Sequence, residues 1–308
     1  MVFRKNITIA IPVYERFEFF EDAINSAINQ TEKCNIIVID NCSTHDRFEN
    51  FTNSLGLYYV RYFKNKDNIG YANNWNNCIT LCDTQWLTIL HSDDALSPYY
   101  IENVSKLIEE SPNEVAFIVK NETGSIPRRI YERPSKVKVN KRLRPLIFLF
   151  GNAANFPGNI FNLEQMQEVK FQKHLLGAAD YTFWFELSKI KPLAYTDAIL
   201  AFYRVSQEQD SATMNVKEVV IEPTYFSRNK IIGFKNSFIK LLSMNELYNL
   251  YSYYHHFYNR KGNLDIKFAS KEIENYFNLF NNPLAKLVLN PFLRIIRYSV
   301  KYVCMRNY

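Results

Sequence analysis

The chain has 308 residues, of which 47% are hydrophobic and 22% charged, and its formal net charge is +6 at pH 7. This composition excludes a disordered or fibrous protein and predicts a substantial core, with one principal domain and a C-terminal addition. The five cysteines form no disulfide pattern, no apolar stretch is long enough to span a bilayer, and no signal peptide precedes the first strand. We therefore expect a cytoplasmic protein with reduced thiols.

The first 110 residues alternate between strand and helix signals. Short runs of branched apolar residues predict buried strands, and apolar residues at helical spacing predict helices. The expected strands are 7–11, 35–39, 59–63 and 86–90, and the expected helices are 18–30, 48–55, 71–81 and 98–110. Strands that alternate with helices indicate an α/β fold with a parallel sheet covered on both faces. The polar loops after the strands, 12–16, 40–46 and 91–94, should therefore meet in one binding crevice.

Two adjacent carboxylates follow the last of these strands, in the run His91-Ser92-Asp93-Asp94. Such a pair suits a hard divalent cation, Mg²⁺ or Mn²⁺, which takes oxygen ligands and commonly shares them with a diphosphate. Taken alone, the run is more often a solvated loop or a helix cap. Its surroundings decide between these interpretations.

Several blocks, in this order, resemble the inverting nucleotide-sugar glycosyltransferases of bacterial family 2. The blocks are Ile9-Ala10-Ile11-Pro12-Val13-Tyr14, Val38-Ile39-Asp40-Asn41-Cys42-Ser43-Thr44, Asn68-Ile69-Gly70-Tyr71 and His91-Ser92-Asp93-Asp94. The resemblance covers about the first two-thirds of the chain. It implies a GT-A, Rossmann-like nucleotide-diphospho-sugar transferase domain at 1–215, with a donor half at about 1–120 and an acceptor half at about 145–215. A helical C-terminal region is expected at 216–308.

The resemblance also implies a nucleotide-sugar site at the strand ends. Its expected residues are Pro12, Val13, Tyr14, Glu15, Asp40, Asn41, Asn68, Gly70, Asn74, His91, Ser92, Asp93 and Arg204. Asp40 and Asn41 suit a uracil ring, which offers one N–H donor between two carbonyl acceptors, so we expect a UDP-sugar. The alternative for these segments is ordinary turns and helix caps. Arg204 suits phosphate oxygens and a structural salt bridge equally well.

The metal ligands implied by the resemblance are Asp94, as the main ligand, and Asp93, with Mn²⁺ or Mg²⁺ as the cofactor. The chain departs from the family pattern at three positions near this site. His91 stands where the family often has Asp, Glu15 where it commonly has Asn, and Ser206 where many relatives carry His. The third metal ligand is therefore open.

Inverting transfer needs a base that takes the proton of the acceptor hydroxyl. The segment Leu176-Gly177-Ala178-Ala179-Asp180-Tyr181 resembles the acceptor-side segment of the family, and Asp180 matches the general base. Ala179 replaces an acidic residue that often precedes it. The alternative role for Asp180 is to cap a helix that starts at Tyr181. Glu186, on the same helix, is the reserve candidate.

The expected function is transfer of a sugar from a nucleotide-sugar donor to a glycan or lipid-linked glycan acceptor with inversion, in bacterial surface polysaccharide synthesis. A catalytically impaired sugar-nucleotide-binding protein is the alternative, because of the departures at His91, Ala179 and Ser206. An NAD-dependent oxidoreductase is disfavoured, since Pro12 to Glu15 replaces a glycine-rich turn. No nucleic-acid partner is expected, because the basic residues form no recognised motif.

Two basic segments remain. Lys120 to Arg144 is expected to form either a solvated surface loop or a lid over the acceptor. Residues 285–308 contain five basic and no acidic residues. Their expected helix has an apolar face of Leu289, Leu293, Ile296, Val300 and Val303, with Arg294, Arg297 and Lys301 displaced from it. This helix either lies on the anionic inner face of the cytoplasmic membrane or docks on the core.

Overall fold

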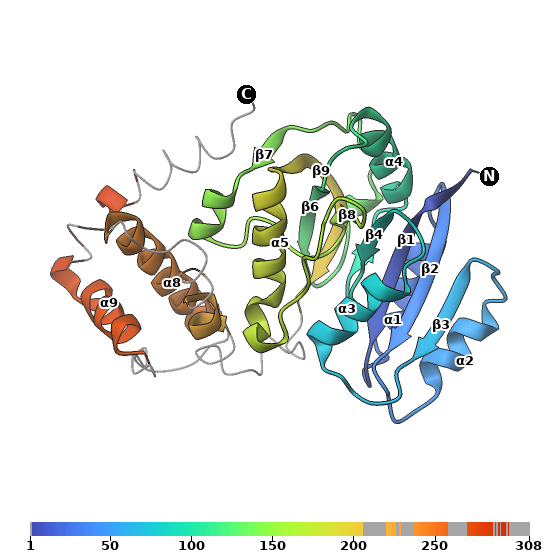
Figure 1. Ribbon diagram of the computed structural model, residues 1–308, viewed down its shortest axis with the longest axis horizontal. Coiled ribbons are helices and arrows are strands. Elements are labelled where there is room, and N and C mark those ends of the chain that lie inside the picture. The colour runs from blue at the N-terminus through green and yellow to red at the C-terminus, as the bar shows by residue number, and fades with distance from the viewer. Residues whose placement is uncertain are drawn as a thin grey trace.

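The computed structural model describes residues 2–205, 220–225, 228, 237–257, 270–285, 287, 289, 291–293 and 295. One sheet of nine strands forms the centre of the larger part, and the helices α8 and α9 lie to one side of it (Figure 1). Within the described residues, no helix combines the length and the apolar character that crossing a membrane requires.

The sheet has the strand order β3-β2-β1-β4-β8-β6-β9-β5, and β7 pairs with β9 outside this path. The strands are β1 (Phe3–Val13), β2 (Lys33–Asp40), β3 (Val60–Lys64), β4 (Trp86–Ile89), β5 (Ala95–Leu96), β6 (Ala116–Gly124), β7 (Lys141–Leu143), β8 (Ile160–Asn162) and β9 (Leu193–Arg204). The first four predicted strands are β1 to β4, and they run parallel as predicted. Beyond β4 the sheet is mixed, because β8 is antiparallel to both β4 and β6.

The helices lie close to their predicted positions in the first half of the chain. They are α1 (Phe20–Ile28), α2 (Arg47–Ser54), α3 (Tyr71–Leu81), α4 (Tyr100–Glu110), α5 (Ala179–Ile190), α8 (Ser237–Phe257) and α9 (Lys271–Asn281). Three short 3₁₀ helices are η1 (Arg129–Tyr131), η2 (Pro145–Phe150) and η3 (Lys173–Ala178). In α1 the buried residues Phe20, Ala23, Ile24 and Ala27 follow helical spacing, so one face of the helix packs on the sheet.

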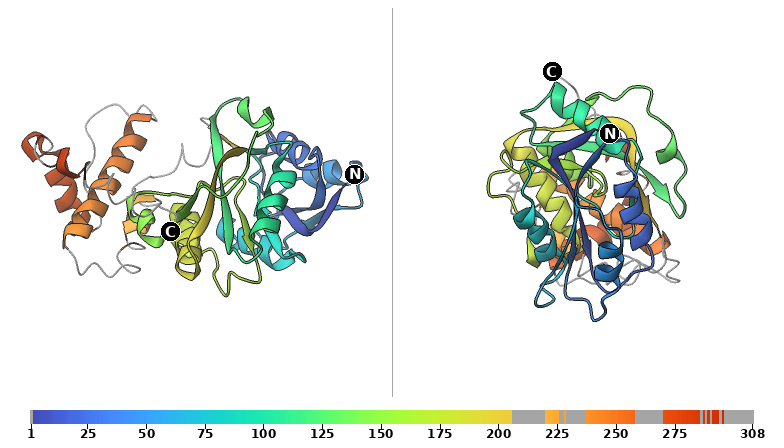
Figure 2. Two further views of the ribbon diagram at one scale, coloured as in Figure 1. Left: turned by 90° about the horizontal axis from the view of Figure 1, so that it is seen from above. Right: turned by 90° about the vertical axis from the view of Figure 1, so that its right-hand side faces the viewer.

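Two apolar cores cover the two faces of the sheet. One contains the buried side chains of α1, α2 and α4, among them Phe20, Phe48 and Tyr100. The other contains those of α3 and α5, among them Cys78 and Trp184. The end-on view shows these helices on opposite sides of the strands (Figure 2). Because β1, β2 and β4 are buried between two layers, their polar carboxyl ends are the parts of them that open toward a ligand.

Gly158 permits the loop before β8 to approach β6 and β9 closely. Its φ of +78° favours glycine, and a Cβ there would lie 2.5 Å from Ala201 Cβ and 2.8 Å from Val119 Cγ2. No other residue type fits this position without movement of a strand.

The helical C-terminal part has its own apolar cluster, in which Tyr248 of α8 packs against Phe277 and Phe280 of α9. Leu293 is buried in this cluster and Leu289 packs against it, so these two members of the predicted tail face contact protein. A different set is exposed: Leu284, Leu287, Phe292 and Ile295. The predicted tail residues Ile296, Val300, Val303, Arg294, Arg297 and Lys301, and the predicted domain boundary near 215, lie outside the described residues.

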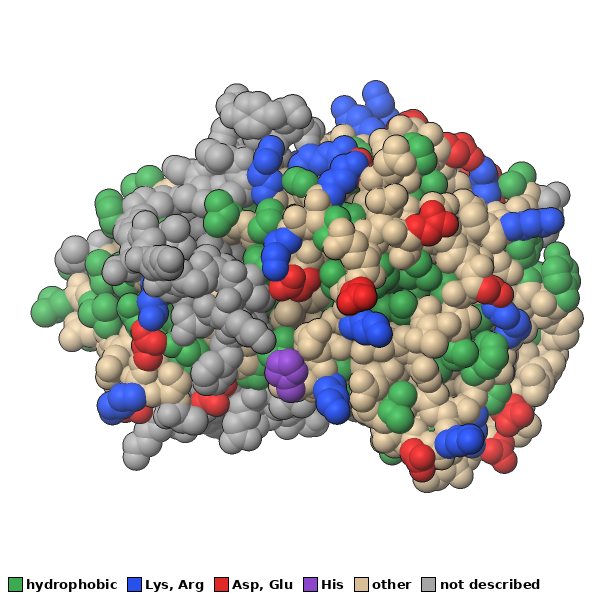
Figure 3. Space-filling view, in the orientation of Figure 1, with side chains coloured by type: hydrophobic (Ala, Val, Ile, Leu, Met, Phe, Trp, Pro, Cys, Tyr) green, Lys and Arg blue, Asp and Glu red, His purple; other side chains and the backbone are tan. Residues whose placement is uncertain are grey.

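The basic segment Lys120 to Arg144 spans most of β6, η1 and β7. Three of its cations pair with carboxylates of other segments: Arg133 with Glu102, Lys141 with Asp197 and Arg142 with Glu114. In the space-filling view, Lys and Arg side chains gather along the upper edge of this face, near β7 (Figure 3). These pairs favour the surface-loop interpretation of this segment.

Candidate active site

One large cavity of about 1100 Å³ opens at the carboxyl ends of β1, β2 and β4. It brings together eleven of the residues predicted from the sequence: Pro12, Val13, Tyr14, Glu15, Asn41, Asn68, Gly70, Asn74, His91, Ser92 and Asp93. Asp180, predicted as the base, lines the same cavity. Asp40, Asp94 and Arg204 do not line it, and their places are described below.

A cluster of asparagines lies at the cavity, and three of its members, Asn41, Asn68 and Asn74, line it. Asn41 donates to Asn68 Oδ1 at 2.8 Å, and its own Oδ1 accepts from Asn65 at 3.1 Å. Asn65 also donates to Asn74 Oδ1 at 2.9 Å, and it accepts from Asn77 at 2.7 Å. The cluster therefore fixes the loop after β2 against the start of α3. Such a network of satisfied amides holds its side chains in one arrangement before a ligand binds.

Glu15 joins the loops after β1 and β2. It has a φ of +53°, and its carboxylate accepts from Thr44 N at 2.9 Å and Thr44 Oγ1 at 3.0 Å. The hydrogen bond from the Thr44 backbone is the main reason that the pKa of Glu15 is lowered. The carboxylate thus stabilises the shape of the crevice wall as well as lining it.

Asp40 is fully buried below this wall. One carboxylate oxygen accepts from Ser43 N at 2.8 Å and Ser43 Oγ at 2.6 Å, and the other accepts from Tyr62 OH at 2.7 Å. Burial and this hydrogen bond raise the pKa of Tyr62. One oxygen of Asp40 therefore holds the Asx-type turn after β2, which is the alternative role described for this residue, and the other binds Tyr62 of β3. Contact with a base stays a prediction.

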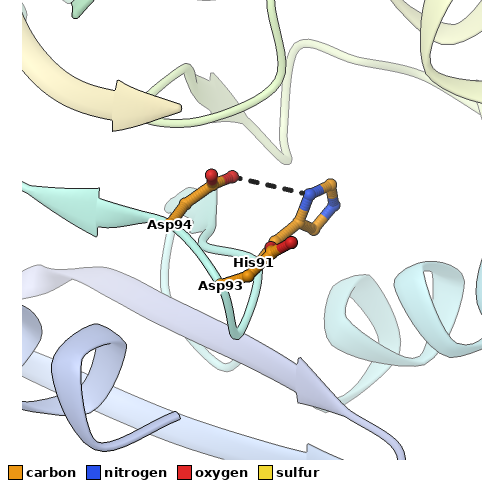
Figure 4. Close-up of side chains that lie close together, drawn as sticks. All are labelled: His91, Asp93 and Asp94. Carbon is orange, nitrogen blue, oxygen red and sulfur yellow. Dashed lines mark ion pairs between the residues drawn. The ribbon is translucent and has the colours of Figure 1, made fainter. Parts of the chain in front are cut away.

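The acidic loop after β4 holds three candidate metal ligands. Ligand atoms of His91, Asp93 and Asp94 lie within 4.8 Å of one another (Figure 4). Asp94 is buried, and its Oδ2 has no hydrogen-bond partner among the described residues, with His91 Nδ1 at 3.7 Å. Burial, followed by the charge of Asp93, raises the pKa of Asp94 well above its usual range. Two carboxylates, an imidazole and one buried oxygen that lacks a donor fit a divalent cation.

Arg204, at the end of β9, fixes this acidic loop through hydrogen bonds to Asp93 and Asp94. Its backbone N–H donates to Asp94 Oδ1 at 2.9 Å and its Nε to the Asp93 carbonyl at 2.7 Å. Its Nη2 pairs with Asp22 at 2.9 Å. The observed contacts match the structural alternative, and a contact with phosphate stays a prediction.

Aromatic rings pack around His91 in the lining of the cavity. Trp75 stacks on His91 with 5.2 Å between ring centroids, and Phe156 lies 4.2 Å from the same imidazole. Asn76, beside Trp75, exchanges two hydrogen bonds with the backbone of Phe171, each of 2.9 Å. Helix α3 is therefore attached to the acceptor half.

Asp180 lies in the first turn of α5, which begins at Ala179, and no side-chain hydrogen bond caps this helix at Ala178. The Asp180 carboxylate accepts from Asn152 Nδ2 at 2.9 Å. Burial raises the pKa of Asp180 to about 6, although hydrogen bonds from the Tyr181 backbone and Asn152 oppose the shift. A carboxyl group with this pKa can accept a proton near neutral pH. The reserve candidate Glu186 pairs with Lys189 and is not among the residues that line the cavity.

Several cavity residues were not identified from the sequence. They are Asn152, Asn155, Phe156, Thr224, Arg228 and Asn249. Each comes from a loop or helix with no distinctive motif, so no local pattern could have indicated it. The supporting residues Asn65 and Asn77 carried one weak signal, since they lie in an asparagine-rich stretch.

The family model described as glycosyl transferase family 2 matches residues 8–165. An uncharacterised glycosyltransferase from Rickettsia conorii is 28% identical over 224 residues, which cover 68% of this chain and 36% of the relative. One from Haemophilus influenzae is 25% identical over 266 residues, which cover 79% of this chain and 80% of the relative. The chain thus spans about a third of the length of the Rickettsia conorii relative and most of the Haemophilus one.

Solved structures share the fold. S. aureus TarS 1-349 in complex with UDP-GlcNAc aligns with a TM-score of 0.63 at 13% identity, covering 89% of this chain and 78% of that one. The mannosyltransferase PcManGT from Pyrobaculum calidifontis, in complex with GDP-Man and Mn²⁺, aligns with a TM-score of 0.56 at 13% identity, covering 97% and 87%. The family match over more than half of the chain, on a fold that both structures share, makes this protein a member of glycosyl transferase family 2.

Proposed function

We propose that this protein transfers a sugar from a UDP-sugar to a hydroxyl group of a glycan or lipid-linked glycan with inversion at the anomeric carbon. The observation that carries this proposal is that one cavity is lined both by the nucleotide-side residues and by Asp180. Direct displacement needs such an arrangement, since the acceptor must approach the sugar from the side opposite the diphosphate. The family membership and the complexes of TarS with UDP-GlcNAc and of PcManGT with GDP-Man support a nucleotide-sugar donor.

In this mechanism the acceptor oxygen forms a bond to the anomeric carbon while the bond from that carbon to the diphosphate oxygen breaks. Asp180 takes the proton of the acceptor hydroxyl, and its raised pKa favours this transfer. Asn152 orients the carboxylate through the hydrogen bond to Oδ2. The nucleoside diphosphate is the leaving group, and Asn41, Asn68 and Asn74 would hold the nucleotide side.

Asp94 and Asp93, with His91 beside them, would hold Mn²⁺ or Mg²⁺. When bound, this ion supplies positive charge that stabilises the departing diphosphate. The buried Oδ2 of Asp94, which has no donor among the described residues, supports this assignment. The Mn²⁺ in the PcManGT complex is consistent with it.

The place of action proposed for the enzyme is the inner face of the cytoplasmic membrane, in the synthesis of a bacterial surface polysaccharide. The feature that supports membrane contact is the exposed apolar set Leu284, Leu287, Phe292 and Ile295, together with the basic tail. Apolar side chains beside basic ones are typical of helices that lie on anionic lipid.

The deciding experiment is a donor screen with UDP-sugars and GDP-mannose in the presence of Mn²⁺, read out as release of nucleoside diphosphate with and without glycan acceptors. We expect release from one UDP-sugar. The alternative, a sugar-nucleotide-binding protein without turnover, is favoured by Ala179 and would give binding by calorimetry with no release.

A further inference from the structure

Arg228 is a buried cation in the wall of the large cavity. It is 2% exposed, and it lines the cavity beside Tyr181, the residue after Asp180. Its Nε donates to Tyr181 OH at 3.2 Å, and its guanidinium lies 5.5 Å from the centre of the Tyr181 ring. Its Nη1 donates to the Ser243 carbonyl at 3.0 Å and to Ser243 Oγ at 3.2 Å.

All of these partners are neutral. Among the described residues, no carboxylate forms an ion pair with Arg228, and its Nη2 has no hydrogen-bond partner. Asp180 and Glu246 line the same cavity but make no ion pair with it. By contrast, Arg142 and Arg204, which are also partly or largely buried, each contact a carboxylate. A buried charge without a counterion is destabilising, and a bound anion would offset this cost.

The position of Arg228 indicates which substrate carries that anion. Its contacts are Tyr181 on α5 and Ser243 on α8, and Tyr181 OH in turn donates to the Phe148 carbonyl of η2 at 2.5 Å. The expected nucleotide contacts come from other elements, the ends of β1, β2 and β4 and the start of α3. Arg228 therefore belongs to the acceptor side, next to the group that would take the acceptor proton.

We propose that Arg228 binds an oxyanion of the acceptor, so that the acceptor is an anionic glycan with a phosphate or carboxylate near the reacting hydroxyl. The inference rests on the proposed glycosyl transfer and adds the chemical class of the acceptor to it. A guanidinium group suits this ligand, because its parallel N–H donors match two oxygens of phosphate or carboxylate. Nη2, which donates to no described residue, would make the first of these bonds.

The test uses the full chain saturated with UDP and Mg²⁺, titrated calorimetrically with inorganic phosphate, with acetate and with chloride at matched ionic strength. We expect phosphate or acetate to bind the wild type and chloride not to bind. Arg228→Met should weaken this binding at least about tenfold, because it removes the forked donors. Arg133→Met is the matched control, since Arg133 is exposed, pairs with Glu102 and lies outside the cavity.

Arg228→Lys is the second variant, and circular dichroism confirms that each variant used is folded. Arg228→Lys keeps the positive charge but not the two parallel N–H donors of the guanidinium, so this variant should bind the same anion more weakly than the wild type. The relative affinity for phosphate and acetate distinguishes the two sources of the oxyanion. Absence of binding to the wild type, or equal binding by folded Arg228→Met, overturns the proposal. If UDP itself does not bind, the proposed function fails instead.

The activity arm compares acceptor sugars that carry a phosphate or carboxylate with uncharged ones of the same length. Arg228→Lys should lower kcat/KM for the charged acceptor at least about tenfold relative to the uncharged acceptor. An equal loss for both acceptors would assign Arg228 a purely structural role.

Discussion

The side-chain amide of Asn152 donates a hydrogen bond to the carboxylate of Asp180, with 2.9 Å between Nδ2 and Oδ2. The two residues come from different parts of the chain, the loop after η2 and the first turn of α5. The contact favours the charged form of Asp180, whereas burial opposes that form and prevails, so that the pKa rises to about 6. The protonation of Asp180 therefore changes within the range in which enzymes are assayed.

Asp180→Asn should lower kcat at least about 10²-fold while donor binding stays close to that of the wild type, because an amide cannot accept the acceptor proton. Stopped assays and UDP titration measure the two effects. The folded-state pKa of Asp180 lies above its unfolded value, so its contribution to stability is greatest in acid and is lost as the pH rises through about 6. The variant should accordingly be no less stable than the wild type at pH 7.5. A parallel loss of donor affinity would indicate a structural role.

Asn152→Ala should move the acid limb of the kcat/KM profile to higher pH. In the wild type this limb should lie near pH 6, since activity needs the charged carboxylate. Loss of the Asn152 hydrogen bond removes an interaction that lowers the pKa of Asp180, so the carboxyl group would protonate at a higher pH. Asn155→Ala is the control, because Asn155 lines the same cavity and its side chain makes no hydrogen bond to Asp180. Identical profiles for both variants would contradict this role for Asn152.

Mn²⁺ should raise the melting temperature of the wild type and not that of Asp94→Asn. Binding to the folded state alone stabilises a protein in proportion to the logarithm of ligand concentration over Kd, and a neutral amide is a much weaker ligand. Thermal shift with and without EDTA measures this. Asp83→Asn, an exposed carboxylate that pairs with Arg61, is the control. An equal response of Asp94→Asn and the wild type to Mn²⁺ would remove Asp94 from the metal site.

Gly158→Ala should destabilise the fold more than Gly56→Ala does. Both glycines have a positive φ, so each variant should lose about 1–2 kcal/mol from the left-handed conformation. Gly56 has open space around it, whereas a Cβ at Gly158 meets Ala201 and Val119. Overpacking there should add about 1–3 kcal/mol. Urea unfolding measures both variants, and equal losses would show that Ala201 and Val119 make room for the added methyl group at little cost.

Leu287→Glu combined with Ile295→Glu should reduce flotation with anionic vesicles, since both side chains are exposed and a charge opposes their insertion. Ile126→Glu is the control, because Ile126 is also exposed but lies before η1, far along the chain from the tail. Two results would contradict contact through this set. One is that the wild type floats equally with neutral and with anionic lipid, and the other is that both variants float as well as the wild type does.

Much of the donor half could be predicted from the sequence because its elements are local. The run Trp86–Ile89 became β4, 71–81 became α3 with the predicted bounds, and the loops after β1, β2 and β4 do meet at one cavity. Buried strands and amphipathic helices are determined by nearby residues, so a periodic pattern is enough to locate them.

The acceptor half could not be predicted in the same way, because its contacts join distant segments. The pairing of β8 between β4 and β6 makes the sheet mixed, and the three-residue strand β8 carries no periodic signal. Arg204 illustrates the same point within the site, since its partners Asp94, Ser125 and Asp22 are spread over the chain. The sequence alone does not show whether an arginine such as Arg204 binds a carboxylate of the protein or a phosphate of a ligand.

The asparagine cluster of Asn41, Asn65, Asn68, Asn74 and Asn77 should make this part of the cavity insensitive to pH and to ionic strength. Amide side chains carry no charge at any pH in which the protein is folded, and they are indifferent to ionic strength in a way that carboxylate pairs are not. The nucleotide wall should therefore keep its shape while Asp180 gains or loses its proton. Protonation of Asp180 should then change the rate of transfer while the hydrogen bonds among these amides stay as they are.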